Sequence, residues 1–273
     1  MTFRTKLENA NGKIVLLPKC DIILSSGLLG EPEPSAYDAP ASTQRFPLGT
    51  KLIDGERIWR YALAGAAALV AGQPQQQAAA LHAEAPDDIV VGAASAAGDY
   101  TVTLTSTTNI ACAANVYRDG YLVVNDEAGE GHSYKIKSHE ALSGTSDAVF
   151  TLYDPIIVAL TTSSQVGITR NPYASTIVAP GTTPTGIVLG IAPRSVTAAY
   201  YYWLQTGGPC AVVAHAAIAV GAFVTAGLTA AKVDPSGHDA TYGILQTQQI
   251  IGQALTLAVT DGESFLVNLT LDH

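Results

Sequence analysis

The sequence predicts an all-β protein with two small antiparallel β domains, each a sandwich or a barrel, preceded by an extended N-terminal arm and a short helix. Three observations support this fold class. Short runs of alternating apolar and polar residues recur about every 8–15 residues from residue 89 onward. Gly, Asn, Asp or Pro bounds each run, and no helical pattern lies between them. Closely spaced strands without intervening helices favour an antiparallel sandwich or barrel.

Residues 1–61 are expected to form the arm. Five prolines between residues 18 and 47 interrupt this segment too often for a core of its own. A disordered tail is the alternative, but Phe46 and Trp59 are large apolar residues, in which pure disorder is depleted. An arm that becomes ordered on a partner surface therefore fits better.

The arm also concentrates positive charge. Residues 1–60 hold eight of the fourteen Lys and Arg residues of the chain, against seven acids. We therefore expect this part of the chain to meet an acidic partner. The expected contact residues are Arg4, Lys6, Lys13, Phe46, Arg57, Trp59 and Arg60.

Residues 62–88 are rich in alanine and glutamine and are expected to form a helical linker. Gly65, Gly72 and Pro74 would break a long helix, so the prediction is one short helix over residues 75–83. Its glutamine face is expected to be solvated or packed on a neighbour.

Residues 89–180 are expected to form a β-sandwich. The run Y-T-V-T-L-T from residue 100 places Val102 and Leu104 on one face and threonines on the other. The corner at residues 129–131 predicts a hairpin turn. The other expected strands are 121–124, 134–137, 149–153 and 156–160.

Residues 181–273 follow a Pro- and Gly-rich stretch and are expected to form a C-terminal β-barrel. Its first hairpin is predicted over residues 200–213, Y-Y-Y-W-L-Q-T-G-G-P-C-A-V-V, with the turn at Gly-Gly-Pro. Successive side chains of a strand point to opposite faces, so only alternate aromatic residues can share a surface. The expected residues of the barrel core or of a subunit interface are Tyr200, Tyr201, Tyr202, Trp203 and His215.

The composition excludes several classes of function. Charged residues make up 14% of the chain, against about 25% in a typical protein, which indicates a surface largely covered by other subunits. The net charge of −9 argues against sequence-independent binding to nucleic acid, which requires basic patches. The longest apolar stretch, residues 61–72, is too short to span a membrane, and the first residues lack the apolar run of a signal peptide.

Catalytic and metal-binding motifs are missing from the sequence. Cys20, Cys112 and Cys210 have neither zinc-site spacing nor the even number of a disulfide framework, which suits a reducing cytoplasm. The nearest matches to a Walker A loop, a zincin motif and a nucleophile elbow each lack a required residue. Four residues could be drawn as a site for a hard cation, although a solvated turn is the favoured interpretation: Asp126, Glu127, Glu130 and His132. We expect no enzymatic activity, no cofactor and no metal.

Several segments resemble structural proteins of tailed bacteriophages. They are residues 46–51, 55–61, 120–126, 129–139, 152–155 and 171–173. The C-terminal segments 200–209, 219–221 and 251–254 are similar to the small β-barrel of capsid decoration, or cement, proteins. This resemblance implies a homotrimer on the outer surface of the virion, bound to the major capsid protein and assembled in the cytoplasm of a host bacterium.

Two other functions stay open at this point. A host-surface or carbohydrate-binding module of a head fibre would use the threonine faces and the aromatic run as a glycan site. A virion-associated hydrolase would need a catalytic carboxylate pair or triad, for which Asp126 and Glu130 are the residues to test.

Overall fold

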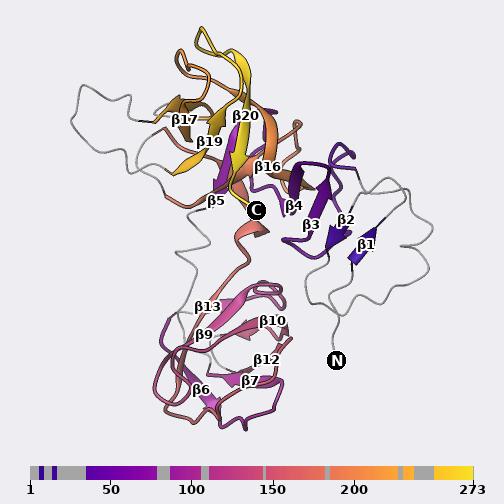
Figure 1. The fold of residues 1–273 in the computed structure, drawn as a ribbon. Coiled ribbons are helices and arrows are strands. Elements are labelled where there is room, and N and C mark those ends of the chain that lie inside the picture. The colour runs from indigo at the N-terminus through magenta and orange to yellow at the C-terminus, as the bar shows by residue number, and fades with distance from the viewer. Residues whose placement is uncertain are drawn as a thin grey trace. The chain divides into compact units, whose positions relative to one another are not determined.

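The computed structural model confirms an all-β fold with two antiparallel parts (Figure 1). In the described part of the chain, the helical structure is a single 3-10 turn, η1 (Pro172–Ala174). The chain forms two compact units: unit 1 comprises Met1–Ala79 and Pro172–His273, and unit 2 comprises Ala80–Asn171. The structure describes residues 6–8, 14–16, 35–78, 87–105, 111–143, 146–181, 185–226, 230–236 and 249–272.

Unit 2 is a closed six-stranded barrel rather than the expected sandwich, with strand order β10-β12-β7-β6-β13-β9. All neighbouring strands are antiparallel, and β13 pairs with both β9 and β6, which closes the ring. A sandwich and a barrel both bury one face of each strand, so the sequence pattern does not separate them. The strands are β6 (Ile89–Ala93), β7 (Thr101–Leu104), β9 (Tyr121–Asp126), β10 (Ser133–His139), β12 (Ala148–Leu152) and β13 (Gln165–Thr169), with a small sheet of β8 (Ala111–Cys112) and β11 (Leu142–Ser143).

The barrel interior is filled by the inward-facing residues of each strand. Val102 and Leu104 are fully buried, as the period-two pattern predicts. The hairpin of β9 and β10 is confirmed, and both Gly129 and Gly131 in its turn have positive φ. The strand expected at 156–160 is wrong: its two end residues are buried and the three between them are exposed, so burial does not alternate.

Unit 1 contains a twelve-stranded sheet with the order β1-β2-β3-β4-β16-β20-β19-β17-β18, to which β5, β14 and β15 are attached. The long strand β16 lies between β4 and β20 (Figure 1). The strands are β1 (Lys6–Glu8), β2 (Ile14–Leu16), β3 (Lys51–Asp54), β4 (Arg57–Leu63), β5 (Pro74–Gln77), β14 (Thr176–Val178), β15 (Val188–Ile191), β16 (Tyr201–Val213), β17 (Phe223–Ala226), β18 (Val233–Pro235), β19 (Ile250–Ala254) and β20 (Ser264–Thr270).

This topology corrects the expected domain boundaries. The N-terminal strands β3 and β4 belong to the same sheet as the C-terminal strands, and β4 runs through the expected boundary at residues 61/62. The expected barrel of residues 181–273 is therefore half of a larger sheet that the N-terminal residues complete. The second boundary falls at 171/172 instead of 180/181.

The short helix expected over residues 75–83 is also wrong where it can be tested. Residues 74–77 form β5, which pairs with β14 and β15, and residues 79–86 lie outside the described part. Gln75 and Gln76 are buried, and the Gln76 side-chain amide donates to the Thr185 hydroxyl at 2.7 Å. Pairing with two strands overrides the helical propensity of this segment.

The predicted hairpin over residues 200–213 is a single strand, β16. Its first half pairs with β4 and its second half with β20, and the register shifts between Gln205 and Gly207. Gly208 has a φ of 75°, and a Cβ atom there would collide with the backbone oxygen of Glu56 in the turn between β3 and β4. The glycines therefore allow a close backbone contact where a chain reversal was expected.

Candidate functional site

One of the expected arm contacts, Trp59, is a core residue, and a second, Phe46, is partly buried against the same cluster. Trp59 is 1% exposed and forms a cluster with Leu52, Tyr61 and Trp203, and Phe46 packs against it. The ring centroid of Trp203 lies 5.1 Å from that of Tyr61, directly across from it on the neighbouring strand. The burial of Trp59 corrects the expectation that it contacts another protein, whereas the partly buried Phe46 stays an untested prediction.

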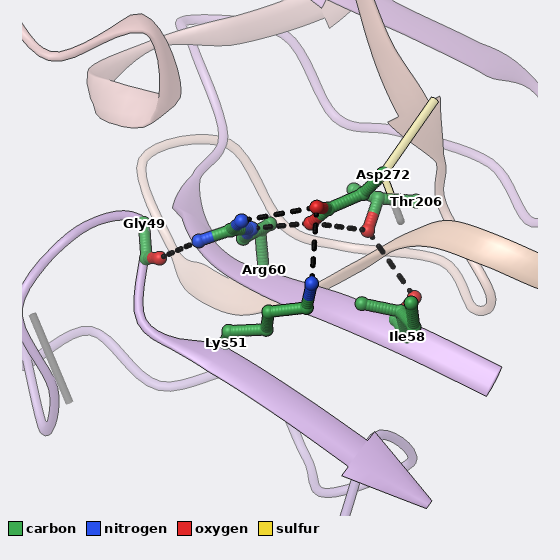
Figure 2. Close-up of polar contacts among 6 residues, drawn as sticks. All are labelled: Gly49, Lys51, Ile58, Arg60, Thr206 and Asp272. Carbon is green, nitrogen blue, oxygen red and sulfur yellow. Dashed lines mark hydrogen bonds and ion pairs between the residues drawn. The ribbon is translucent and has the colours of Figure 1, made fainter. Parts of the chain in front are cut away.

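The basic residue Arg60 is bound within the chain as well (Figure 2). Its Nε donates to Asp272 Oδ2 at 2.6 Å, and Lys51 Nζ lies 3.2 Å from Asp272 Oδ1. Thr206 donates to the same carboxylate at 3.4 Å, and the other end of Arg60 donates to the Gly49 backbone oxygen. Burial alone would raise the pKa of Asp272, but Arg60 and then Lys51 outweigh it and lower that pKa.

The remaining expected arm contacts divide into two groups. Arg57 lies over the Trp59 ring, 5.1 Å from its centroid, and its guanidinium donates to the Tyr37 hydroxyl. The Arg57 side chain is therefore held against unit 1 and is 33% exposed. The side chains of Arg4, Lys6 and Lys13 lie outside the described part of the chain, although the backbone of Lys6 begins β1.

The aromatic run of β16 divides between two cores, as the alternation of side chains predicts. Trp203 belongs to the cluster with Trp59, whereas Tyr202 faces the opposite cluster and shares a 2.8 Å hydrogen bond with the Thr176 hydroxyl. Burial raises the pKa of Tyr202 well above its usual range. Tyr201 is half-buried and stacks on Tyr61, and Tyr200 packs beside Tyr202. The run serves packing within unit 1.

His215 is not a core residue. Its side chain is 36% exposed, and Nδ1 lies 2.9 Å from Oδ1 of the buried Asp234. Lys232 and Asp261 form an ion pair at 2.6 Å. The sequence does not indicate these pairs, because the partners are separated by 19 and 29 residues.

Among the described residues, His139 is the one buried histidine of the barrel, and no local sequence pattern indicates its role. Nδ1 donates to the Glu140 backbone oxygen at 2.6 Å, and Nε2 accepts from the Tyr117 backbone N–H at 2.9 Å. Its ring stacks on Phe150 at 4.6 Å. Burial lowers its pKa, which the hydrogen bond to Glu140 opposes only partly. The two partners fix a neutral imidazole protonated at Nδ1.

A pH dependence follows from the buried His139. Its folded-state pKa is lower than its unfolded-state pKa, so the unfolded chain binds more protons in acid. The contribution is fully present above about pH 6.5 and is lost as the pH falls, by at most about 1.4 kcal/mol per pH unit. Chemical unfolding at pH 5 to 8 measures it. His139→Gln should flatten the slope, and a slope equal to that of the wild type in this variant would contradict the assignment.

The acidic turn that could be drawn as a cation site is a structured hairpin turn. Asp126 accepts a hydrogen bond from the backbone N–H of Glu127, and His132 Nδ1 lies 2.8 Å from the Gly129 backbone oxygen. Within the described ranges no three His, Cys, Asp or Glu residues converge as metal ligands would. Cys112 and Cys210 are free thiols, and burial raises the pKa of Cys210 to about 12; Cys20 lies outside these ranges.

A surface that the sequence analysis missed lies on unit 1, on or beside the outer side of β17, β19 and β20. We name it the apolar face. The inner side of the same strands is buried through Val224, Ile251 and Val267. The alternation of these strands predicts one buried side but does not locate an exposed apolar surface on the other. The face consists of Val220, Phe223, Ile250, Leu255, Leu257, Val259 and Leu266, all of which are exposed.

Neither a search for membrane-spanning helices nor a comparison with known proteins indicates a function for this chain. Among the described residues no helix is both long and apolar enough to cross a membrane. No protein-family model, no curated protein and no solved structure matches this chain.

Proposed function

We propose that this chain is a structural protein of a bacteriophage head, without enzymatic activity. It binds the outer surface of the capsid as a homotrimer and ties neighbouring subunits of the major capsid protein together. The observation that carries the proposal is the exposed apolar face on a chain with only 14% charged residues, since such a surface fits an assembly. The resemblance of the C-terminal segments to capsid decoration proteins supports the same class.

The packing of the aromatic run disfavours the carbohydrate-binding alternative. Tyr202 and Trp203, which would form the stacking platform, are 3% and 4% exposed and lie on opposite faces of β16. A glycan array on the purified protein tests this alternative, and a selective signal would favour it over the capsid role.

The stabilising effect on the shell would arise by mass action. A protein that binds only the assembled shell lowers the free energy of that state relative to the empty or ruptured shell. Several contacts per oligomer raise the apparent affinity through their effective concentration. No chemistry at the site is required for this role.

The part of the chain that would reach the shell is now narrower than residues 1–61. The chain is packed against the C-terminal part of unit 1 from about residue 35, since Ala36 is buried and Ala41 exchanges two backbone hydrogen bonds with Tyr201. The strands β1 and β2 add to the edge of β3. We therefore assign the capsid contact to residues 1–34, which hold Arg4, Lys6 and Lys13.

Deletion of residues 1–34 tests the proposal. The truncated protein is expected to stay folded and oligomeric, because the aromatic cluster and the β4–β16 pairing are kept. It should lose at least ~10-fold in affinity for expanded shells in a pelleting assay, since one contact of about 1.4 kcal/mol already accounts for tenfold. A second variant exchanges Arg4, Lys6 and Lys13 for glutamine without the deletion, and it should weaken shell binding in the same direction if these charges make the contact. Undiminished pelleting of the truncated protein would refute the assignment of these residues.

A further inference from the structure

The residues of the apolar face come from three paired strands and from the loops beside them. Phe223 pairs with Gln253 of β19, and Leu255 lies two residues after Gln253, just beyond the end of that strand. The backbone N–H of Leu255 donates to the Leu266 oxygen at 2.8 Å, which places Leu266 beside it on β20. Neighbours in such pairs lie within side-chain reach of one another.

Two loops extend the face at one end. Ile218 and Ala258 exchange two backbone hydrogen bonds, which joins the loop before β17 to the loop before β20. Leu257 and Val259 flank Ala258 and are 55% and 60% exposed, and Val220 is 64% exposed. These side chains project from backbone that is fixed by pairing.

The loop that presents Leu257 and Val259 is also fixed by a charge. The Glu263 carboxylate accepts hydrogen bonds from the backbone N–H groups of Val259 at 2.6 Å and Thr260 at 3.1 Å. Asp261 pairs with Lys232. The acidic side chains next to the face are therefore bound within the chain. Because the loop is already ordered, binding a partner would cost little conformational entropy here.

The face and its surroundings carry no formal charge over long stretches of sequence. No Asp, Glu, Lys or Arg occurs in residues 195–231, 249–260 or 264–271. The whole chain has a net charge of −9, so two copies repel one another over most orientations. An uncharged surface is the part that a second copy can approach without this cost.

We propose that the apolar face binds a second copy of this chain and forms the subunit contact of the oligomer. The absence of charge favours a second copy as the binding partner. An uncharged surface makes no ion pairs with an acidic or a basic protein, but it can pack against the same uncharged surface of another copy. Apolar side chains at the centre and bound charges at the edge match the general anatomy of subunit interfaces. The inference rests on the homo-oligomeric part of the proposed function and names the surface responsible.

Charged substitutions at the most exposed positions test the proposal. The double variant Val220→Asp, Leu257→Asp should sediment as a monomer at concentrations where the wild type is an oligomer, with self-association at least ~100-fold weaker because like charges would then meet. The matched control is Ile157→Asp, Val158→Asp in unit 2, which adds the same charge at residues that are 66% and 41% exposed. It should keep the wild-type mass. Unchanged far-ultraviolet circular dichroism verifies the fold of both variants.

Three outcomes would overturn the inference: a monomeric wild type, a face variant that keeps the wild-type mass, or a control variant that dissociates equally. Shell pelleting separates this result from the proposed function. A wild type that associates through the face but does not bind shells would refute the capsid role and leave the inference standing. A face variant that still binds shells, but more weakly and as a monomer, would support both.

Discussion

Replacement of Trp203 by alanine is expected to lower the free energy of unfolding of unit 1 by about 3–5 kcal/mol, the usual cost of removing a buried aromatic side chain. Trp203 is 4% exposed and touches both Tyr61 and Phe46, at ring-centroid distances of 5.1 and 5.4 Å. The cavity would open where β16 meets β4. Strands β3 and β4 would then lose part of the side-chain packing that holds them on β16.

Urea unfolding followed by circular dichroism measures the effect of Trp203→Ala. Trp203→Phe should recover most of the loss, because it restores much of the volume and the aromatic contacts. Tyr121→Ala, at a residue that is 40% exposed on the barrel, is the matched surface control and should change stability by less than ~0.5 kcal/mol. A loss below ~1 kcal/mol for Trp203→Ala would mean that the cluster does not hold the two ends of unit 1 together.

Substitution of Gly208 by alanine is expected to destabilise unit 1 more than a positive φ alone explains. The left-handed conformation costs a non-glycine residue about 1–2 kcal/mol. At this position the new Cβ would also meet the backbone oxygen of Glu56, which cannot move aside as a flexible side chain could. The turn between β3 and β4 would have to shift away from β16.

Gly262 offers the matched control for this steric effect. Its φ is 81°, close to the 75° of Gly208, but nothing lies within 4 Å of an added Cβ. Gly262→Ala should therefore show the conformational cost alone, and Gly208→Ala should unfold at a clearly lower denaturant concentration. Equal midpoints for the two variants would contradict the close approach of Glu56.

The strands and their buried sides could be predicted from local pattern. Val102, Leu104 and the turn at Gly129 and Gly131 follow from period-two alternation and turn chemistry, which are properties of neighbouring residues. Pairing partners could not be predicted in this way. Nothing near Trp59 shows that it joins a buried cluster with Trp203, so the local pattern leaves a contact with another protein as an equally good interpretation.

The Gly207-Gly208-Pro209 segment shows the same limit in another form. Glycine and proline mark both tight turns and points of close backbone approach, and the sequence does not separate the two. The segment was interpreted as a turn, whereas β16 continues through it. Likewise, Gln75 and Gln76 favour a helix by propensity, and the strands on both sides of β5 decide otherwise.

The candidate surface was the least predictable part. Exposed apolar residues such as Phe223 and Leu255 look like core residues in a sequence, because a hydrophobic side chain on the wrong face has no signature of its own. The low proportion of charged residues was the only sequence signal of a covered surface. It indicates that such a surface exists but not where it lies.

The insertion of unit 2 into unit 1 sets an order of events during protein synthesis. The strands of the barrel find all their partners within residues 89–169, so the barrel can close while the ribosome is still adding the remainder of the chain. Strand β4 has to wait, because Ile58 and its partner Thr206 are 148 residues apart, and the carboxylate that binds Arg60 belongs to Asp272. Until those residues emerge, the apolar side chains of β3 and β4 stay without their partners. The nascent chain is therefore expected to be most prone to aggregation after the barrel has formed and before β16 has been made.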